Sequence, residues 1–141
     1  MDAERPPPLP KRCALRVLIV DDHKDTAESF FRVLKMWGFK AEVCLTPTEA
    51  LVAYRNHCPQ AVLLDLGLPE MDGYELARIF SRRSNGEGKP LLIAVTAHGL
   101  DTDRQRCQEA GFDHFWLKGS DPEELHKLLR REACRRGSIA P

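Results

Sequence analysis

The chain has 141 residues, which suits one compact domain with a single hydrophobic core and short tails. Hydrophobic residues make up 43% and charged residues 30%, as in an ordinary globular protein, and 21 basic residues balance 21 acidic ones. This neutrality argues against general attraction to nucleic acid or anionic lipid, so we expect neither direct nucleic-acid binding nor membrane association.

The first residues contain the proline cluster Pro6-Pro7-Pro8-Leu9-Pro10 and no apolar segment of the kind that directs secretion. No stretch approaches the roughly 20 apolar residues that cross a bilayer. Five scattered cysteines lack metal-ligand spacing and favour reduced thiols in the cytoplasm. We expect a disordered leader over 1–14, a domain over 15–136 and a disordered tail over 137–141. A polyproline ligand for a partner domain is the alternative interpretation of the leader.

Short apolar runs then alternate with segments of helical periodicity. The apolar runs predict strands at 16–20, 40–45, 61–65, 90–95 and 114–117. Capping residues, prolines and periodicity predict helices that begin near Lys24, Thr46, Asp72, Asp101 and Asp121. The fourth helix has only Leu100, Cys107 and Ala110 to bury, and this thin apolar stripe predicts weak docking.

Five strands alternating with five helices through short loops predict an α/β fold with a central parallel sheet. Right-handed crossovers favour a doubly wound, flavodoxin-like sheet. Its five strands, numbered along the chain, would have the order 2-1-3-4-5. The loops after the strands then share one edge of the sheet, and ligands bind there beside the point where the strand order reverses.

Polar residues stand at the carboxyl ends of four of these strands: Asp21 and Asp22, Asp65, Thr96, and Lys118. Three carboxylates in one crevice repel one another unless a cation neutralises them. Magnesium fits, because it binds one or two carboxylates and leaves positions for phosphate oxygens. Carboxylates that only cap helices are the alternative. An ammonium and a hydroxyl at the same edge favour phosphoryl transfer, with Asp65 forming an aspartyl phosphate.

Four short motifs resemble those of the receiver domain of two-component response regulators, and they occur in the family's order. They are LIVDD at 18–22, LLDLGLPEMDG at 63–73, VTA at 95–97 and FWLK at 115–118. The resemblance covers about 16–135, nearly the whole chain.

The resemblance implies a role for each matching acidic residue. Asp65 would be the phosphoacceptor. Asp22 and Asp65 would bind magnesium directly and Asp21 through water. Gly67 would bind it through its backbone carbonyl.

The resemblance also assigns contacts to the phosphoryl group. Thr96 and Lys118 would touch it, and Phe115 would be the aromatic switch residue that rotates inward together with the threonine. Gly119 departs from the family, which usually has a proline after a cis peptide. A cis bond before a non-proline residue costs roughly 3 kcal/mol, so a trans peptide or a mobile loop is expected here.

The histidines give weaker signals. His98, beside the expected path of the attacking water, could position water, shield the phosphate or face solvent. The other four show no ligand spacing and are predicted to be surface or half-buried residues: His23, His57, His114 and His126.

We therefore expect a stand-alone phosphorelay receiver. A histidine kinase or histidine phosphotransfer protein would supply the phosphoryl group. The face formed by the fourth helix, fifth strand and fifth helix would switch its affinity for an unknown downstream protein. Such a switch is not an enzyme, because it catalyses only its own phosphorylation and dephosphorylation.

The alternatives are a pseudo-receiver that binds proteins without phosphorylation, and an aspartyl-phosphate phosphatase. The sequence Asp21-Asp22-His23 lacks the D-x-D motif of haloacid dehalogenase-type phosphatases.

Overall fold

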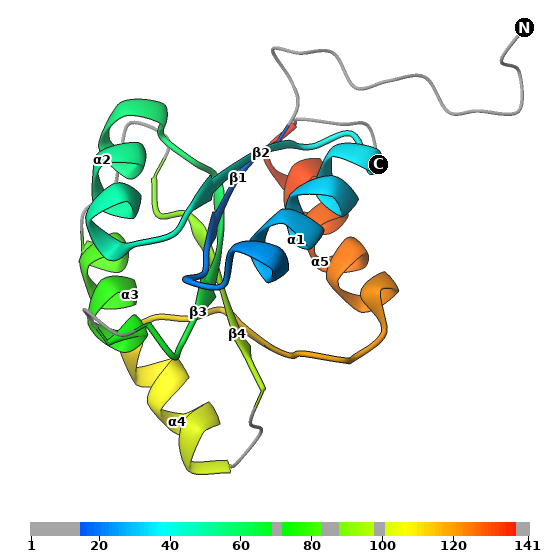
Figure 1. Ribbon diagram of the computed structural model, residues 1–141. Coiled ribbons are helices and arrows are strands. Elements are labelled where there is room, and N and C mark those ends of the chain that lie inside the picture. Colours follow the sequence, from blue (N-terminus) through cyan, green and yellow to red (C-terminus); the bar gives the residue numbers. More distant parts are fainter. Residues whose placement is uncertain (1–14, 69–71, 83–87, 98–100, 138–141) are drawn as a thin grey trace, which may run out of the picture.

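A computed structural model describes residues 15–68, 72–82, 88–97 and 101–137, and their side chains except at 101–103. Five parallel strands form one sheet with helices on both faces (Figure 1). The elements are β1 (Arg16–Val20), α1 (Lys24–Met36), β2 (Lys40–Cys44), α2 (Pro47–His57), β3 (Ala61–Asp65), α3 (Gly73–Arg82), β4 (Leu91–Thr96), α4 (Asp101–Ala110), β5 (His114–Leu117) and α5 (Pro122–Arg135). The strand order is β2-β1-β3-β4-β5, which confirms the predicted doubly wound, flavodoxin-like sheet.

The boundaries of the strands differ from the prediction by one residue at most. β2 ends at Cys44 rather than Leu45, and β4 runs from Leu91 to Thr96 rather than from Pro90. Proline has no N–H to donate to the sheet, so the strand begins after it. At the other end Thr96 pairs with Leu117, which extends β4 by one residue.

The core has two layers because the sheet is covered on both sides. In β3, Val62 and Leu64 pack with α2, α3 and α4, whereas Ala61 and Leu63 pack with α1 and α5 (Figure 1). None of these four side chains is more than 1% exposed. Burial on both faces explains why the strand is a continuous apolar run rather than an alternating pattern.

The helices bury most of the residues that their periodicity predicted. Cys107 and Ala110 are each 2% exposed and form the described part of the thin stripe of α4, whereas Leu100 lies outside the described residues. Five other apolar residues at helical spacing are only half-buried: Phe30, Phe31, Trp37, Ile79 and Leu128. Among the residues that the structure describes, no helix combines the length and the apolar character needed to cross a membrane.

The starts of α2 and α5 are fixed by side-chain caps. The Thr46 hydroxyl accepts a hydrogen bond from the Glu49 N–H at 3.1 Å, and the Asp121 carboxylate accepts one from the Glu123 N–H at 3.0 Å. The Glu49 carboxylate lies 3.4 Å from the Thr46 hydroxyl. These contacts satisfy N–H groups that have no partner within the helix.

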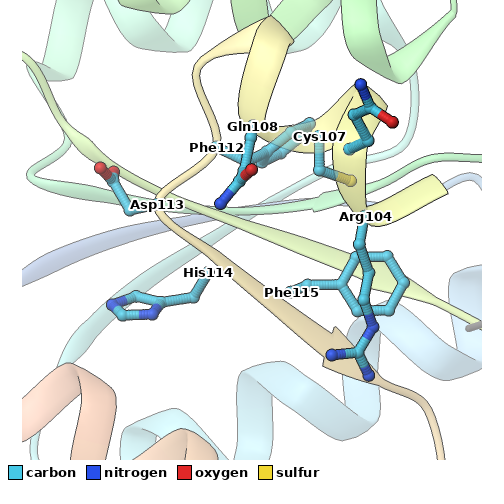
Figure 2. Close-up of a pocket in the computed structure, with 8 residues that line it drawn as sticks. Arg104, Cys107, Gln108, Phe112, Asp113, His114 and Phe115 are labelled. Atoms are coloured by element: carbon cyan, nitrogen blue, oxygen red, sulfur yellow. The ribbon is translucent and has the colours of Figure 1, made fainter. Parts of the chain in front are cut away.

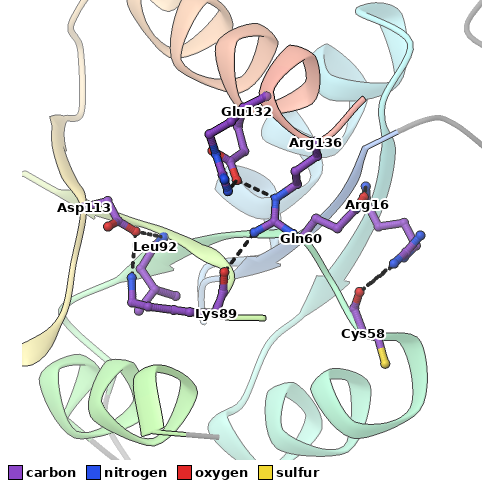
Figure 3. Close-up of polar contacts among 9 residues, drawn as sticks. Arg16, Cys58, Gln60, Lys89, Leu92, Asp113, Glu132 and Arg136 are labelled. Carbon is purple, nitrogen blue, oxygen red and sulfur yellow. Dashed lines mark hydrogen bonds and ion pairs between the residues drawn. The ribbon is translucent and has the colours of Figure 1, made fainter. Parts of the chain in front are cut away.

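A polar cluster at the amino end of the sheet joins α5 to the segment before β4 (Figure 3). Glu132 is only 6% exposed and accepts hydrogen bonds from Arg135 and Arg136. Arg136 also donates to the Lys89 carbonyl at 2.9 Å, and the Lys89 ammonium pairs with Asp113 at 2.9 Å. Burial by itself would raise the pKa of Glu132, but hydrogen bonds from the two arginines and their charges lower it below the ordinary value of 4.5.

Replacing Glu132 by glutamine is therefore expected to lower the free energy of unfolding at neutral pH by about 1.5–3 kcal/mol, the usual contribution of a hydrogen bond to a charged group. Because the pKa of Glu132 is lower in the folded state, its stabilisation is present above pH 4.5 and is lost as the pH falls through the folded-state pKa. Urea unfolding of wild type and Glu132→Gln at neutral and acid pH measures both effects. The exposed Glu124→Gln on the same helix is the control. A difference that persists in acid would contradict the prediction.

Candidate functional site

The strand order brings two acidic residues together at the carboxyl edge of the sheet. β1 and β3 are neighbours, and Val20 pairs with Leu64, so the next residues, Asp21 and Asp65, lie side by side. Both are buried, at 2% and 7% exposure. This is the point at which the strand order reverses, as predicted for the ligand-binding edge.

Asp22 and His23 complete an acidic cluster at this edge. One ligand atom from each of Asp21, Asp22, His23 and Asp65 can be chosen so that all lie within 4.8 Å of one another. Asp22 Oδ1 is buried and accepts no hydrogen bond from any described residue. A buried carboxylate oxygen that accepts no hydrogen bond and lies among other carboxylates fits a small divalent cation, which prefers oxygen ligands.

Lys118 brings a positive charge to the same cluster. Its ammonium lies 3.4 Å from Asp21 Oδ2 and 3.9 Å from Asp65 Oδ2. The Lys118 N–H donates to the Thr96 carbonyl at 2.7 Å, which continues the pairing of β4 with β5 up to the site. The sequence prediction that Lys118 and Asp65 meet is confirmed.

A glycine turn sets the direction of the chain after Lys118. The Lys118–Gly119 peptide is trans, Gly119 has a φ of +90°, and the Ser120 N–H donates to the Leu117 carbonyl at 3.0 Å. A β-turn with positive φ at its third residue favours glycine. The turn after Lys118 therefore forms with a trans peptide, one of the two expected outcomes at this position.

Thr96 lies at the same edge, on the strand next to Asp65. Asp65 pairs with Val95, and the Leu66 N–H donates to the Val95 carbonyl at 3.3 Å, so Thr96 is the next residue along β4. It is 8% exposed. The backbone therefore places a hydroxyl-bearing side chain at the edge that carries the carboxylates.

Gly67 contacts Asp65 through its backbone. The Gly67 N–H donates to Asp65 Oδ1 at 3.1 Å and fixes the orientation of the carboxylate. A Cβ atom at position 67 would lie 3.7 Å from the same oxygen, so any larger side chain there would stand beside Asp65. The expected contact through the Gly67 carbonyl stays a prediction.

The electrostatics of the cluster oppose ionisation of Asp65. Burial raises its pKa above the ordinary value of 3.8, and the neighbouring Asp21 charge raises it further. The Gly67 N–H and the Lys118 ammonium act in the opposite direction without cancelling the increase. A cation at the cluster would relieve this cost, and the chemistry of the donor set therefore fits magnesium.

The described histidines have the exposure that the sequence predicted, and one of them lies beside the carboxylates. His23, with 69% of its side chain exposed, has its Nδ1 within 3.4 Å of Asp21 Oδ1. His57 pairs with Glu42 at 2.8 Å, and His126 stacks on Trp37. The sequence does not predict the contact of His23 with the preceding aspartates, because this contact depends on the orientation of the side chain at the N-cap of α1. His98 and residues 69–71 lie outside the described residues.

Phe115, the expected switch residue, is half-buried between β5 and α4 (Figure 2). The Arg104 guanidinium lies 5.2 Å from the centre of its ring. The two side chains border a hollow of about 360 Å³, whose other lining residues include Cys107, Gln108 and Phe112. A cation–π contact therefore holds the Arg104 side chain over the face of the Phe115 ring.

Comparison with known proteins agrees with this site. A family model described as the response regulator receiver domain matches residues 17–130. The response regulator MprA of Mycobacterium sp. strain KMS is 35% identical over 131 residues, which cover 90% of this chain and 56% of that protein. The chain thus spans about half the length of this curated relative.

Solved structures show the same fold. A CheY-like receiver domain protein of Methanospirillum hungatei has a TM-score of 0.78 at 25% identity, covering 88% of this chain and 97% of the other. The receiver domain of a sensor histidine kinase of Pseudomonas aeruginosa has a TM-score of 0.75 at 27% identity, covering 85% and 98%, with a magnesium ion coordinated in its active-site cleft. The family model, the relatives and the strand-edge cluster agree: this chain belongs to the receiver domain family of two-component response regulators, phosphoacceptor switches of phosphorelay signalling.

Proposed function

We propose that Asp65 accepts a phosphoryl group from a phosphohistidine on a histidine kinase or a histidine phosphotransfer protein. An Asp65 oxygen attacks phosphorus, the P–N bond breaks, and the histidine leaves with the electron pair of that bond. The observation that carries this proposal is the position of the Lys118 ammonium, 3.4 Å from Asp21 and 3.9 Å from Asp65. A fixed positive charge beside a carboxylate nucleophile suits phosphoryl transfer, which depends mainly on positioning and charge neutralisation.

The acidic cluster would hold Mg²⁺ during this reaction. Asp22 and Asp65 would bind the ion directly, Asp21 through water, and Gly67 through its carbonyl. The bound ion would neutralise carboxylate and phosphoryl oxygens. Two observations support this assignment: the buried Asp22 Oδ1 accepts no hydrogen bond from any described residue, and the pKa of Asp65 is raised.

Thr96 and Lys118 would contact the phosphoryl oxygens. Lys118 already lies between Asp21 and Asp65, so the new oxygens need only a small movement of its ammonium. A movement of Thr96 toward the phosphate would open space for Phe115 to rotate inward. The surface of α4, β5 and α5 would then change its affinity for a downstream protein, and the small buried stripe of α4 supports its role as the moving element.

The protein would act in the cytoplasm as a domain over 15–136, with a leader over 1–14 and a tail over 137–141. It would catalyse only its own phosphorylation and dephosphorylation.

The direct test is phosphorylation by acetyl phosphate. We expect wild type with Mg²⁺ to gain one phosphoryl group by intact-mass spectrometry, and Asp65→Asn to gain none. Chelation of Mg²⁺ should abolish the reaction. Asp25→Asn, which changes an exposed aspartate in the first turn of α1, is the matched control and should react like wild type. An unreactive wild type would favour a phosphorylation-independent binding module. Turnover of phosphate esters would favour a phosphatase.

The raised pKa of Asp65 also predicts how metal-free stability depends on pH. Because the folded-state pKa lies above 3.8, the contribution of Asp65 to stability is fully present below that pH and is lost as the pH rises through the folded-state pKa. Without metal at neutral pH, Asp65→Asn should therefore be more stable than wild type in urea unfolding. Added Mg²⁺ should stabilise wild type and so reduce the difference in the free energy of unfolding between the two proteins. A less stable Asp65→Asn in chelator would contradict this.

The Arg104 contact should oppose inward rotation of Phe115. Exposed cation–π contacts contribute about 0.5–1 kcal/mol, so Arg104→Ala should raise the inward-to-outward ratio of the phosphorylated protein roughly two- to fivefold. NMR of the Phe115 ring with excess phosphoryl donor measures this ratio. Arg106→Ala is the control, since Arg106 stacks on Tyr74 at 4.1 Å and pairs with Asp72 at 3.6 Å. An equal change in both variants would rule out a specific Arg104 effect.

A further inference from the structure

We infer that His23 is an additional ligand of the metal site, through a ring nitrogen, and that it gives the site a preference for transition-metal ions such as Co²⁺ and Zn²⁺. The inference rests on the proposed metal site and concerns which ions it selects. The observation behind it is that the imidazole belongs to the same compact cluster as the three carboxylates.

The position of the ring suits coordination. His23 Nδ1 lies 3.3 Å from Asp22 Oδ1 and 3.4 Å from Asp21 Oδ1. Two adjacent ligands of an octahedral ion with bonds of about 2.1 Å stand about 3.0 Å apart. A shift of a few tenths of an ångström would therefore bring His23 Nδ1 and Asp22 Oδ1, a proposed direct ligand, onto one ion. The same Asp22 oxygen accepts no hydrogen bond from any described residue, although His23 Nδ1 is near it.

The backbone holds His23 in this place without using its side chain. His23 is the N-cap of α1 in an extended conformation, and its side chain makes no capping hydrogen bond. Its N–H donates to Asp21 Oδ1 at 2.9 Å, and its carbonyl accepts from the Ala27 N–H at 2.9 Å. The backbone N–H and carbonyl of His23 are therefore both held by hydrogen bonds. Its side chain is 69% exposed, so an ion can reach the ring from solvent.

The chemistry of the donor set then determines selectivity. Mg²⁺ prefers oxygen ligands and retains several waters, so an imidazole adds little to its binding. Imidazole is a good ligand for Co²⁺, Ni²⁺ and Zn²⁺. A cluster of three carboxylates and one imidazole should therefore bind these ions more tightly than three carboxylates alone.

Another interpretation is that a positively charged His23 ring pairs with Asp21 and Asp22 and competes with any cation. The two interpretations predict opposite effects when the ring is removed. Loss of a ligand weakens binding of Co²⁺ and Zn²⁺ selectively, whereas loss of a competing charge strengthens binding of every divalent ion.

Isothermal titration calorimetry of the full chain with Mg²⁺ and with Co²⁺, at one pH, separates these cases. We expect His23→Ala to weaken Co²⁺ binding by about tenfold or more, because even partners outside the first shell change metal affinity 10–100-fold. Mg²⁺ affinity should stay within about twofold. His57→Ala, which removes an exposed histidine paired with Glu42, is the matched control and should bind both ions like wild type.

A second measurement follows the ring itself. With Zn²⁺, the ¹⁵N resonance of one His23 ring nitrogen should shift on binding, while the His57 resonances should not. Equal changes for Mg²⁺ and Co²⁺ in His23→Ala, tighter binding of both ions, or an unshifted His23 ring would overturn the inference and leave the proposed magnesium site intact. If Asp65→Asn binds Mg²⁺ as tightly as wild type, the proposed site fails, and the inference fails with it.

Discussion

Repulsion between buried carboxylates is the constraint around which this molecule is built. Asp21 and Asp65 are less than 10% exposed and adjacent, and this arrangement raises the pKa of Asp65. The chain offsets the repulsion only in part, with the Lys118 ammonium and the Gly67 N–H. An edge with surplus negative charge attracts cations, and a bound cation in turn attracts the phosphoryl group. The repulsion between the carboxylates in the metal-free protein therefore favours metal binding.

The topology of the sheet produces this arrangement. Because β1 and β3 are neighbours although a helix, a strand and a second helix separate them in sequence, residues more than 40 positions apart become adjacent. Lys118 reaches the same edge only because β5 extends the sheet beside β4. The two core layers hold the strands in register, and a shift of one residue would move Asp65 out of the cluster.

The sequence predicts the fold almost completely, because doubly buried strands, capped helices and crossover handedness all indicate one sheet order. It also predicts that Asp21, Asp65 and Lys118 meet, since each ends a strand. It does not predict the turn at Gly119, which depends on a local φ, nor the ring position of Arg104 over Phe115, which depends on side-chain rotamers. Nor does it predict the contact of His23 with Asp21 and Asp22, because the position of an N-cap side chain depends on backbone geometry.

The polar cluster around Glu132 and Arg136 attaches the last turn of α5 to the amino end of the sheet, away from the acidic cluster at the carboxyl edge. The first turn of the same helix begins at Pro122, four residues after Lys118. A rigid rod held at one end swings about that point, so its free end moves farthest. A displacement passed from Lys118 to Pro122 would therefore move the first turn of α5 more than its last turn, which is bound to the Lys89 carbonyl.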